Sequence, residues 1–373
     1  MSDSKSTVEQ LLKLGDVKIN GQRAWDIQVR DERFYKRVLS QGDLGVGESY
    51  TDGWWSSNQL DETIARLMAT DIRANLHISP ALIKTIAVGY IFNRQRLKRA
   101  YKNASTHYSV GNDLYSLMLD KRMIYSCGFW QNVKNLDEAQ EAKLERICQK
   151  LQLKKGMTLL DIGCGWGGFA EYAARNYGVK VSGVSPVKEQ VEVARERAKG
   201  LDIEILQQDY REITGKYDRV VSVGMMEHVG PKNYRTFFQK CHDLLNDNGI
   251  TLHHTIGNNR SVQAVSPWID RYIFPGGVIP SLSQIAKATE KLLVIEDLEN
   301  FGPDYDKTLM VWHSNFVRNY PKLDHEKYDE HFYRMWEFYL LSCAGAFRAR
   351  HMQLYQIIMR KIERSESYRG YRG

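Results

Sequence analysis

Residues 158–168, TLLDIGCGWGG, constrain the fold of this chain more than any other segment. A short apolar run ends in three alternating glycines, Gly163, Gly165 and Gly167, and the helix-forming stretch FAEYAARNYG follows directly. A strand, a glycine turn and a helix in this order bring the backbone close to a ligand at the carboxyl edge of a parallel sheet. The glycines alone do not specify the ligand, because dinucleotide-binding folds use a similar pattern and a simple tight turn is the alternative.

The residues around the glycines narrow the class of ligand. Asp161 lies two positions before Gly163, and the segment lacks the lysine and the serine or threonine of a phosphate-binding loop. An acidic residue at this position suits a cationic or hydrogen-bond-donating ligand better than a pyrophosphate. The segment therefore favours a Rossmann-like site for S-adenosylmethionine (SAM) over a site for NAD.

An alternating α/β series surrounds this segment. Strand patterns occur at TLLDIG, VKVSGVS, IEILQQ, YDRVVSVG and GITLHHTI, with helical stretches between the earlier ones. The preceding stretch DEAQEAKLERICQKLQL predicts a helix capped by Asp137. Proline and glycine interrupt the series at 267–330, where we expect an insertion that covers the site, and residues 323–359 are expected to be helical.

The length of 373 residues predicts two domains, because single cores usually stop growing below this size. We expect an N-terminal helical domain at 1–106, a linking segment at 107–136 that begins the catalytic unit, and a catalytic domain at 137–373. Residues 1–106 contain 16 Lys and Arg against 12 Asp and Glu, a net charge of +4 out of +7 for the whole chain.

The end of the N-terminal domain is strongly basic. Residues 77–106 contain six basic side chains and no acidic one, and Leu82, Ile86 and Tyr90 recur at four-residue intervals. A basic amphipathic helix suits an anionic membrane surface. A helix packed on its own domain with a solvated basic rim is the alternative, and the pattern does not decide between the two.

Composition favours an anionic partner and argues against a metalloprotein, a secreted protein and a membrane-spanning protein. The positive net charge suits an anionic partner, either nucleic acid or a phospholipid surface. The five cysteines are scattered without metal-site spacing, so we expect a reducing cytosol and no bound metal. The N-terminus is polar, unlike a secretory signal, and the longest apolar stretch, 81–92, contains Lys84 and is too short to span a bilayer. We expect a protein that contacts a membrane without crossing it.

Polar residues at the ends of the later strands are candidates for binding and catalysis. Gln190, Gln208 and Asp209 follow the second and third strands, where adenosine binds in this fold, although Asp209 also fits a helix cap. Glu227 and His228 follow the fourth strand, and His254 ends the fifth. Spacing alone assigns no role to these residues, nor to Cys127 and Tyr305.

Eight segments in order carry a resemblance to a known family over nearly the full length of the chain. They are GESYTDGWW (47–55), HYSVGNDLY (107–115), YSCGFW (125–130), LLDIGCGWGG (159–168), MMEHVGPKNY (225–234), LHHTIG (252–257), FGPDYDKTLM (301–310) and CAGAFRAR (343–350). With these segments the chain resembles the cyclopropane-fatty-acyl-phospholipid synthases.

The resemblance implies a Rossmann-like SAM-dependent methyltransferase with an N-terminal helical domain that docks on lipid. The family converts the cis double bond of an unsaturated acyl chain on a membrane phospholipid into a cyclopropane ring, with bound bicarbonate as the base. The implied bicarbonate pocket consists of Cys127, Glu227, His254, Ile256 and Tyr305. The implied SAM contacts are Tyr125, Ser126, the 163–167 glycines, the segment from Ser185 to Gln190, Gln208 and Asp209. Asp161 is added to the expected SAM contacts because it precedes the glycines. The resemblance also suggests a cytoplasmic homodimer that visits the inner membrane.

The sequence leaves three alternative functions and a possible catalytic role for Cys343. A relative that leaves a methyl branch would share SAM and the carbocation. A nucleic-acid methyltransferase would need a base-flipping motif after the fourth strand, and MMEHVG is not one, so we expect no nucleic-acid partner. A non-catalytic lipid-binding protein would not keep both sites. Cys343 is a possible nucleophile, but its apolar surroundings favour an inert structural thiol.

Overall fold

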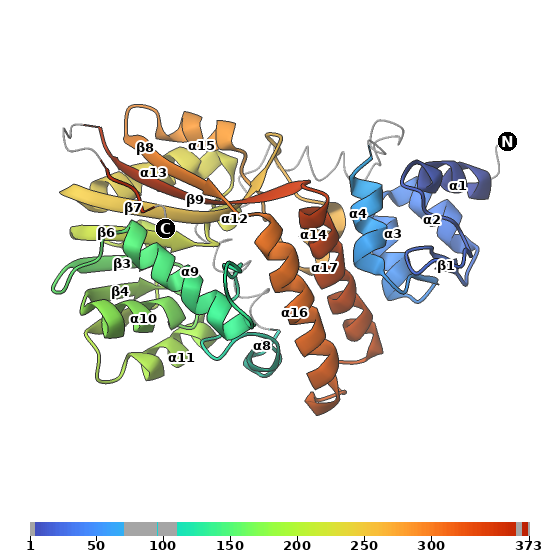
Figure 1. Ribbon diagram of the computed structural model, residues 1–373, viewed down its shortest axis with the longest axis horizontal. Helices are drawn as coiled ribbons and strands as arrows, with labels where there is room; N and C mark the ends of the chain where they lie inside the picture. The colour runs from blue at the N-terminus through green and yellow to red at the C-terminus, as the bar shows by residue number, and fades with distance from the viewer. Residues whose placement is uncertain (1–3, 71–94, 96–109, 363–367, 372–373) are drawn as a thin grey trace. The chain divides into compact units, whose positions relative to one another are not determined.

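The computed structural model describes residues 4–70, 95, 110–362 and 368–371. The chain forms two compact units, each built from separate stretches of sequence (Figure 1). The helical unit contains residues 1–92, 263–275 and 305–352, and the sheet unit contains residues 93–262, 276–304 and 353–373. This division differs from the contiguous domains expected from the sequence, because segments from the second half of the chain pack with the first 70 residues.

The sheet unit is built on seven strands in the order β5-β4-β3-β6-β7-β9-β8. Their bounds are β3 Thr158–Ile162, β4 Lys180–Val184, β5 Ile203–Leu206, β6 Tyr217–Val223, β7 Leu245–Asn258, β8 Leu293–Asn300 and β9 Met352–Lys361. The five strands expected from the sequence are β3 to β7, and all four neighbouring pairs among them are parallel. The chain leaves β3 toward β4 and β5 and then returns to β6 on the other side of β3, so the strand order switches between β3 and β6. Ligands bind at such a switch point in open α/β sheets.

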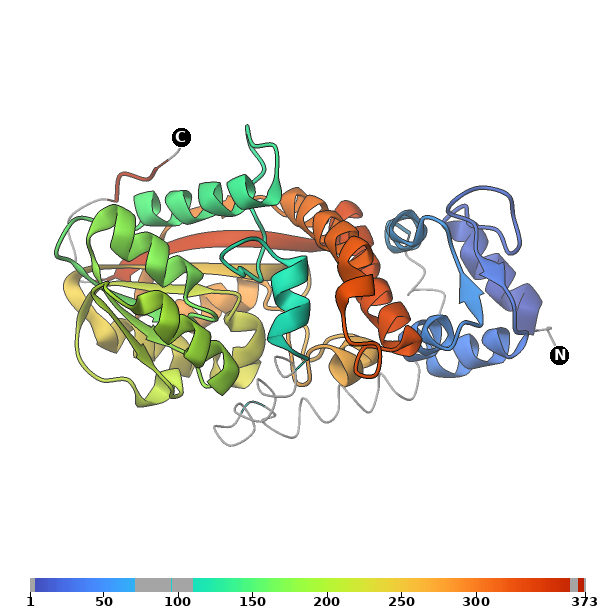
Figure 2. The ribbon, with the colours of Figure 1, turned by 90° about the horizontal axis from the view of Figure 1, so that it is seen from below.

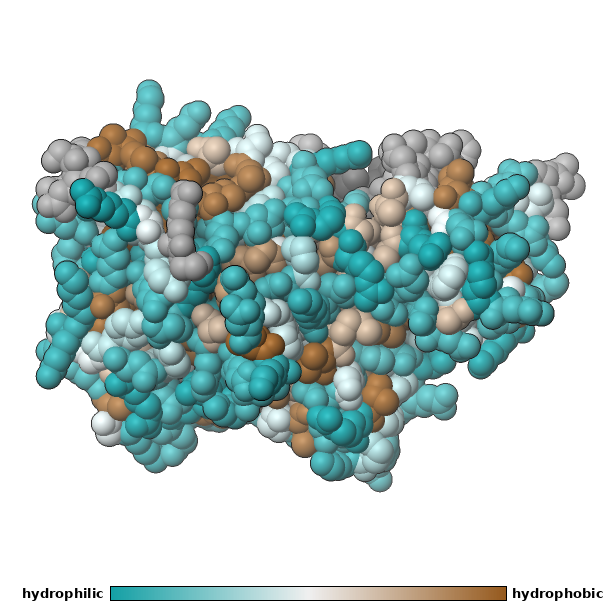
Figure 3. All heavy atoms as spheres, in the orientation of Figure 1, coloured by the Kyte–Doolittle hydropathy of each residue, from teal (hydrophilic) through white to brown (hydrophobic). Residues whose placement is uncertain are grey.

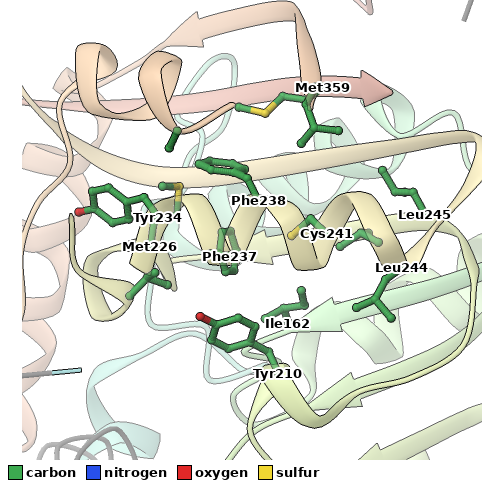
Figure 4. Close-up of a cluster of buried hydrophobic side chains, with 14 of the residues drawn as sticks. Ile162, Tyr210, Met226, Tyr234, Phe237, Phe238, Cys241, Leu244, Leu245 and Met359 are labelled. Carbon is green, nitrogen blue, oxygen red and sulfur yellow. The ribbon is translucent and has the colours of Figure 1, made fainter. Parts of the chain in front are cut away.

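Helices cover both faces of this sheet (Figures 1 and 2). The helices of the unit are α8 Asn112–Met118, α9 Leu136–Lys150, α10 Gly168–Tyr177, α11 Lys188–Ala198, α12 Met226–Val229, α13 Tyr234–Leu244 and α15 Leu282–Thr289. On one face α13 places Tyr234, Phe237, Phe238 and Cys241 in a buried cluster (Figure 4). Their spacing of three and four residues forms one apolar stripe on the helix. On the other face α9 and α10 bury a second cluster against β3 and β4.

Two predictions about the sheet unit are wrong. Asn135, not Asp137, caps α9, since its side chain accepts a hydrogen bond from the Glu138 N–H at 3.0 Å. Residues 352–361 form β9 rather than the end of a helix. Nine of the ten β9 residues are buried, because the strand lies between β7 and β8, and a strand buried on both faces shows no alternation that distinguishes it from a buried helix.

The expected insertion at 267–330 contains regular structure, including α15 and the strand β8 at the edge of the sheet. Apolar side chains are exposed along β8 at Val294, Ile295 and Leu298, and Figure 3 shows an apolar patch over this strand. Within the described ranges, every helix is too short or too polar to cross a lipid bilayer.

The helical unit joins the N-terminal residues to two long later helices. Its elements are α1 Ser4–Leu14, β1 Gln28–Val29, α2 Arg33–Gln41, α3 Asp43–Thr51, β2 Trp55–Ser56, α4 Leu60–Met68, α14 Pro267–Tyr272, α16 Pro303–Asn319 and α17 Glu330–Arg348. Helix α17 lies so close to α4 that a Cβ at Gly345 would stand 2.5 Å from the Asp61 carbonyl oxygen. Arg348 at the end of α17 pairs with Asp61 at 2.7 Å and with Asp306 at 3.0 Å. The expected basic helix at 77–106 lies outside the described residues, apart from Gln95.

Candidate active site

The glycine segment forms an open turn between β3 and α10. Gly163, Gly165 and Gly167 have φ angles of 83°, 53° and 80°, a region in which other residues are strained. The N–H groups of Gly163 and Cys164 donate to the Val184 carbonyl at 2.9 and 3.0 Å, which ties the turn to the end of β4. A Cβ on Gly165 would meet no atom within 4 Å, so the backbone there borders open space. This geometry suits a ligand that approaches the main chain closely.

Asp161 lies in β3 directly below this turn. The residue is 2% exposed, and its Oδ2 has no hydrogen-bond partner among the described residues. Burial raises the pKa of the Asp161 carboxyl to about 7, and the nearby Lys143 charge opposes this rise. A buried carboxylate oxygen without a partner is costly, and such atoms recur where a ligand completes the site. The turn and Asp161 together fit a ligand with a cationic or hydrogen-bond-donating group, as SAM has.

Lys143 is a candidate site residue that the sequence did not predict. Its side chain is fully buried, and its Nζ donates to the Ser126 Oγ at 2.8 Å. Burial lowers the pKa of Lys143 to about 8, while the charges of Asp120, Cys127 and Asp161 oppose that effect. A usable signal was present, because Leu136, Gln140, Lys143, Ile147 and Lys150 follow helical spacing on the buried face of α9.

The segment after β4 and the turn after β5 hold the residues expected near adenosine. The Ser185 hydroxyl donates to the Gln190 Oε1 at 3.1 Å, and both side chains are buried. This bond turns the amide nitrogen of Gln190 away from Ser185. Asp209 caps the short helix Tyr210–Glu212 and pairs with Arg211 at 2.6 Å, so the cap considered from the sequence is present. Gln208 precedes it and is partly exposed.

Glu227 follows β6 in the one-turn helix α12. Its Oε1 accepts a hydrogen bond from the Ile256 N–H of β7 at 2.6 Å. Its Oε2 is shielded from solvent and has no partner among the described residues, although the residue as a whole is half-buried. Burial raises the pKa of the Glu227 carboxyl to about 7, and the Ile256 N–H opposes the rise. One oxygen of Glu227 is therefore available to accept a hydrogen bond.

His254 lies on β7, two residues before Ile256 and on the same face of the strand. Its Nδ1 is 3.3 Å from the Gln356 Nε2, and its ring packs edge-on against Phe301 at 5.7 Å. Its Nε2 is buried and has no partner among the described residues. Burial and the positive charges of Lys143 and Lys150 hold the pKa of His254 well below its usual value, so the imidazole is neutral at pH 7.

Cys127 belongs to the same unit. The residue is fully buried, its Sγ donates to the Gly128 carbonyl at 3.1 Å, and the Lys143 charge acts on both Cys127 and His254. Tyr125 packs its ring against Tyr115 at 5.1 Å, next to Ser126. The sheet unit thus contains four of the five residues of the implied anion pocket and all of the implied SAM contacts.

Tyr305 and Cys343 belong to the helical unit. Tyr305 lies in α16, and its ring packs against Phe347 at 4.6 Å. Cys343 lies in α17, where burial raises the pKa of its thiol to about 12, as its apolar neighbours indicated. Across the residues described here, no three His, Cys, Asp or Glu side chains group as metal ligands do.

Comparison with known proteins identifies the family. The model of the mycolic acid cyclopropane synthetase family matches residues 95–357. The chain belongs to this family. It is 49% identical over 351 residues to the cyclopropane-fatty-acyl-phospholipid synthase of Escherichia coli (strain K12). The alignment covers 94% of this chain and 91% of that protein. It is 32% identical to a tuberculostearic acid methyltransferase of Mycobacterium tuberculosis, covering 88% and 81% of the two chains.

A solved structure supports the same conclusion. Mycolic acid cyclopropane synthase CmaA1, complexed with S-adenosylhomocysteine (SAH) and CTAB, matches with a TM-score of 0.66 and 29% identity, over 70% of this chain and 98% of that one. The resemblance, the Rossmann-like methyltransferase fold and the assignment as a SAM-dependent enzyme of this family are therefore confirmed.

Proposed function

We propose that this enzyme transfers a methylene group from SAM to the cis double bond of an unsaturated acyl chain in a membrane phospholipid, giving a cyclopropane ring. The similarity to the Escherichia coli phospholipid synthase over almost the whole chain carries the proposal. The site supports it, because an open glycine turn lies in the same unit as a carboxylate and an imidazole that each keep one buried atom unpaired.

The chemistry explains why such a site needs few reactive groups. An isolated alkene is a weak nucleophile and cannot be activated by removing a proton. Catalysis therefore rests on holding the alkene in line with the sulfonium methyl in a dry pocket. Methyl transfer leaves a carbocation on the acyl chain and releases SAH. Loss of a proton from the new methyl group then closes the ring. That proton is very acidic, so a weak base suffices when it is well placed.

We further propose that Cys127, Glu227, His254, Ile256 and Tyr305 hold bicarbonate, which would supply that base. The neutral His254 can donate from Nε2, and the hydroxyl of Tyr305 is a second donor. Glu227 can accept a hydrogen bond at its unpaired Oε2, and the Ile256 N–H fixes its other oxygen. A carboxyl pKa near 7 also limits repulsion between Glu227 and an anion.

For SAM we propose contacts from Tyr125, Ser126, Asp161, the 163–167 glycines, Ser185, Gln190, Gln208 and Asp209. Asp161 is the best-supported member of this set, since its Oδ2 has no partner among the described residues and it lies just before the open turn in the chain. Asp209 is the weakest member, because its carboxylate already serves Arg211 and the helix cap.

Incubation with SAM that carries a trideuterated methyl group and with vesicles of monounsaturated phospholipid tests the reaction. Ring closure removes one deuteron, so the acyl product should gain CD₂, release SAH and resist ozone. Omitting bicarbonate from degassed buffer should slow the reaction, and adding it back should restore the rate. Consumption of SAM without any change in the acyl chains would refute the proposal.

A methyl-branched product is the second candidate, favoured by the similarity to the tuberculostearic acid methyltransferase. The same experiment separates the two products. A branch formed by reduction retains all three deuterons and needs an added reductant. A methylene branch retains two deuterons but leaves an alkene that ozone cleaves.

We also propose that residues 1–106 dock a cytoplasmic homodimer on the anionic inner membrane surface. The six basic residues between 77 and 106 should each contribute up to about 1 kcal/mol near anionic headgroups. Replacing Arg94, Arg96, Lys98 and Arg99 by glutamine should reduce vesicle binding and flatten its salt dependence. Replacing four lysines elsewhere on the chain is the charge-matched control. Unchanged co-sedimentation would place the docking surface elsewhere, and sedimentation equilibrium tests the dimer.

A further inference from the structure

A buried polar chain connects helix α9 to His254. Lys150 is fully buried, and its Nζ donates to the Glu299 Oε2 at 2.5 Å and to the Gln356 Oε1 at 2.8 Å. Arg146 also donates to both carboxylate oxygens of Glu299, at 2.7 and 2.5 Å. Burial lowers the pKa of Lys150, but the Glu299 carboxylate opposes the effect. Glu299 therefore keeps Lys150 positioned as a hydrogen-bond donor.

Lys150 decides which way the Gln356 amide points. An ammonium group has donors and no acceptor, so the atom of Gln356 that faces it must be the carbonyl oxygen. The amide nitrogen then faces the other way, toward the His254 Nδ1 at 3.3 Å. Such amide orientations are ambiguous when only neutral groups surround them, but a charged donor removes the ambiguity.

The orientation of Gln356 in turn fixes the proton on His254. An amide nitrogen can only donate, so the Nδ1 of His254 must accept and cannot carry a hydrogen. The ring is neutral at pH 7, because burial and the charges of Lys143 and Lys150 lower its pKa. A neutral imidazole without hydrogen on Nδ1 carries it on Nε2. That atom is buried and lacks a partner among the residues that the structure describes.

We propose that Lys150 and Gln356 are positioning residues that hold His254 in the Nε2–H form, ready to donate to the anion that serves as base. This role rests on the proposed function, whereas the tautomer itself does not. The opposite tautomer would present a lone pair to an anion, so donation and binding would both be lost.

The imidazole ¹⁵N shifts of His254 test the inference directly. In protein labelled with [¹⁵N]histidine, with His254→Gln used for assignment, the Nδ1 should have an acceptor-type shift and the Nε2 a protonated shift at pH 7. Gln356→Glu reverses the direction of the hydrogen bond at Nδ1, because a carboxylate accepts from Nδ1–H. The substitution should therefore move the proton to Nδ1 or charge the ring. Gln356→Leu removes the hydrogen-bond donor to Nδ1 and should give a mixture of the two His254 tautomers.

Kinetics and a control then separate positioning from simple damage. Gln356→Glu should lower kcat at least tenfold while the Kd for SAM stays within twofold. Gln353→Leu is the matched control, since Gln353 is a buried amide on the same strand that bonds to Asn300 at 3.1 Å. It should alter neither the His254 shifts nor kcat.

Two results would overturn the inference: a wild-type His254 with its proton on Nδ1, or unchanged shifts in a folded Gln356→Glu protein. The wild-type spectrum alone gives an answer if the variants do not fold. Expected spectra in an enzyme that makes no cyclopropane would instead refute the proposed function and leave the tautomer assignment intact.

Discussion

Replacing Asp161 by asparagine should make the ligand-free protein more stable and bind SAM less well. The side chain is 2% exposed and its Oδ2 has no partner among the described residues. Its pKa rises from 3.8 to about 7 because burial disfavours the charged form. A pKa raised on folding means that the contribution to stability is complete below the unfolded value near 4 and is lost as the pH rises through 7.

The size of the effect follows from the shift. About three pKa units at ~1.4 kcal/mol each place the cost of ionised Asp161 near 4 kcal/mol above pH 7. Asparagine remains a buried polar group, and Lys143 loses a nearby charge, so the net gain at pH 8 should be about 1–3 kcal/mol. At pH 4 the two proteins should differ little.

Urea unfolding of both proteins at pH 4, 6 and 8 measures this difference. Asp218→Asn is the matched control of opposite sign, because hydrogen bonds from the Thr158 N–H, Asn246 and the Thr158 hydroxyl lower the pKa of Asp218. That variant should be less stable than wild type at pH 8, with the difference shrinking as the pH falls toward the lowered pKa. Calorimetry should show SAM binding to Asp161→Asn weakened roughly tenfold or more, as expected for a lost charge-assisted hydrogen bond. Equal or lower stability of Asp161→Asn at pH 8 would refute the reasoning.

Three further substitutions test other parts of the site and fold. Glu227→Gln should lower turnover about a hundredfold with SAM affinity unchanged, because we propose that its free oxygen holds the base. Calorimetric affinity that falls with the rate would place Glu227 in the SAM site. Cys343→Ser should keep most activity, and a folded but inactive variant that still binds SAM would make the thiol catalytic. Gly257→Ala should destabilise the protein by about 1–3 kcal/mol in urea unfolding, because the new methyl group would overlap the Tyr355 ring; wild-type stability would show that Tyr355 moves aside.

The sequence predicted the parallel part of the sheet because glycines mark the ends of its strands. Gly163 follows β3 and Gly224 follows β6, each with a positive φ that sequence patterns associate with a turn. Turn residues also flank β8, where Gly302 and Pro303 follow its end, but β9 is apolar without a period and follows a long helix directly in the sequence. Their pairing also joins residues some 60 positions apart, which no local pattern encodes.

The residues proposed for the site stand out in the sequence for a related reason. Glu227 and His254 are conspicuous because they stand at the ends of strands, and the resemblance to the family assigned them roles. Lys143, Lys150 and Gln356 were missed, because lysines in a helix and glutamine in a strand ordinarily face water. Only the three-dimensional packing shows that α9 and β9 bring these groups to His254 from distant parts of the chain.

Three of the buried side-chain atoms without a described partner in the sheet unit lie on or just after neighbouring strands. Asp161 lies in β3, Glu227 follows β6, and His254 lies in β7, three strands that are neighbours at the carboxyl edge of the sheet. Each unpaired atom costs about 1–3 kcal/mol in the ligand-free protein, and the cost is removed when a ligand completes the hydrogen bond. The parallel sheet explains why they lie together, since strands that point the same way end at the same edge. We propose that ligands complete these hydrogen bonds, so substitutions at this edge should change stability and ligand affinity in opposite directions.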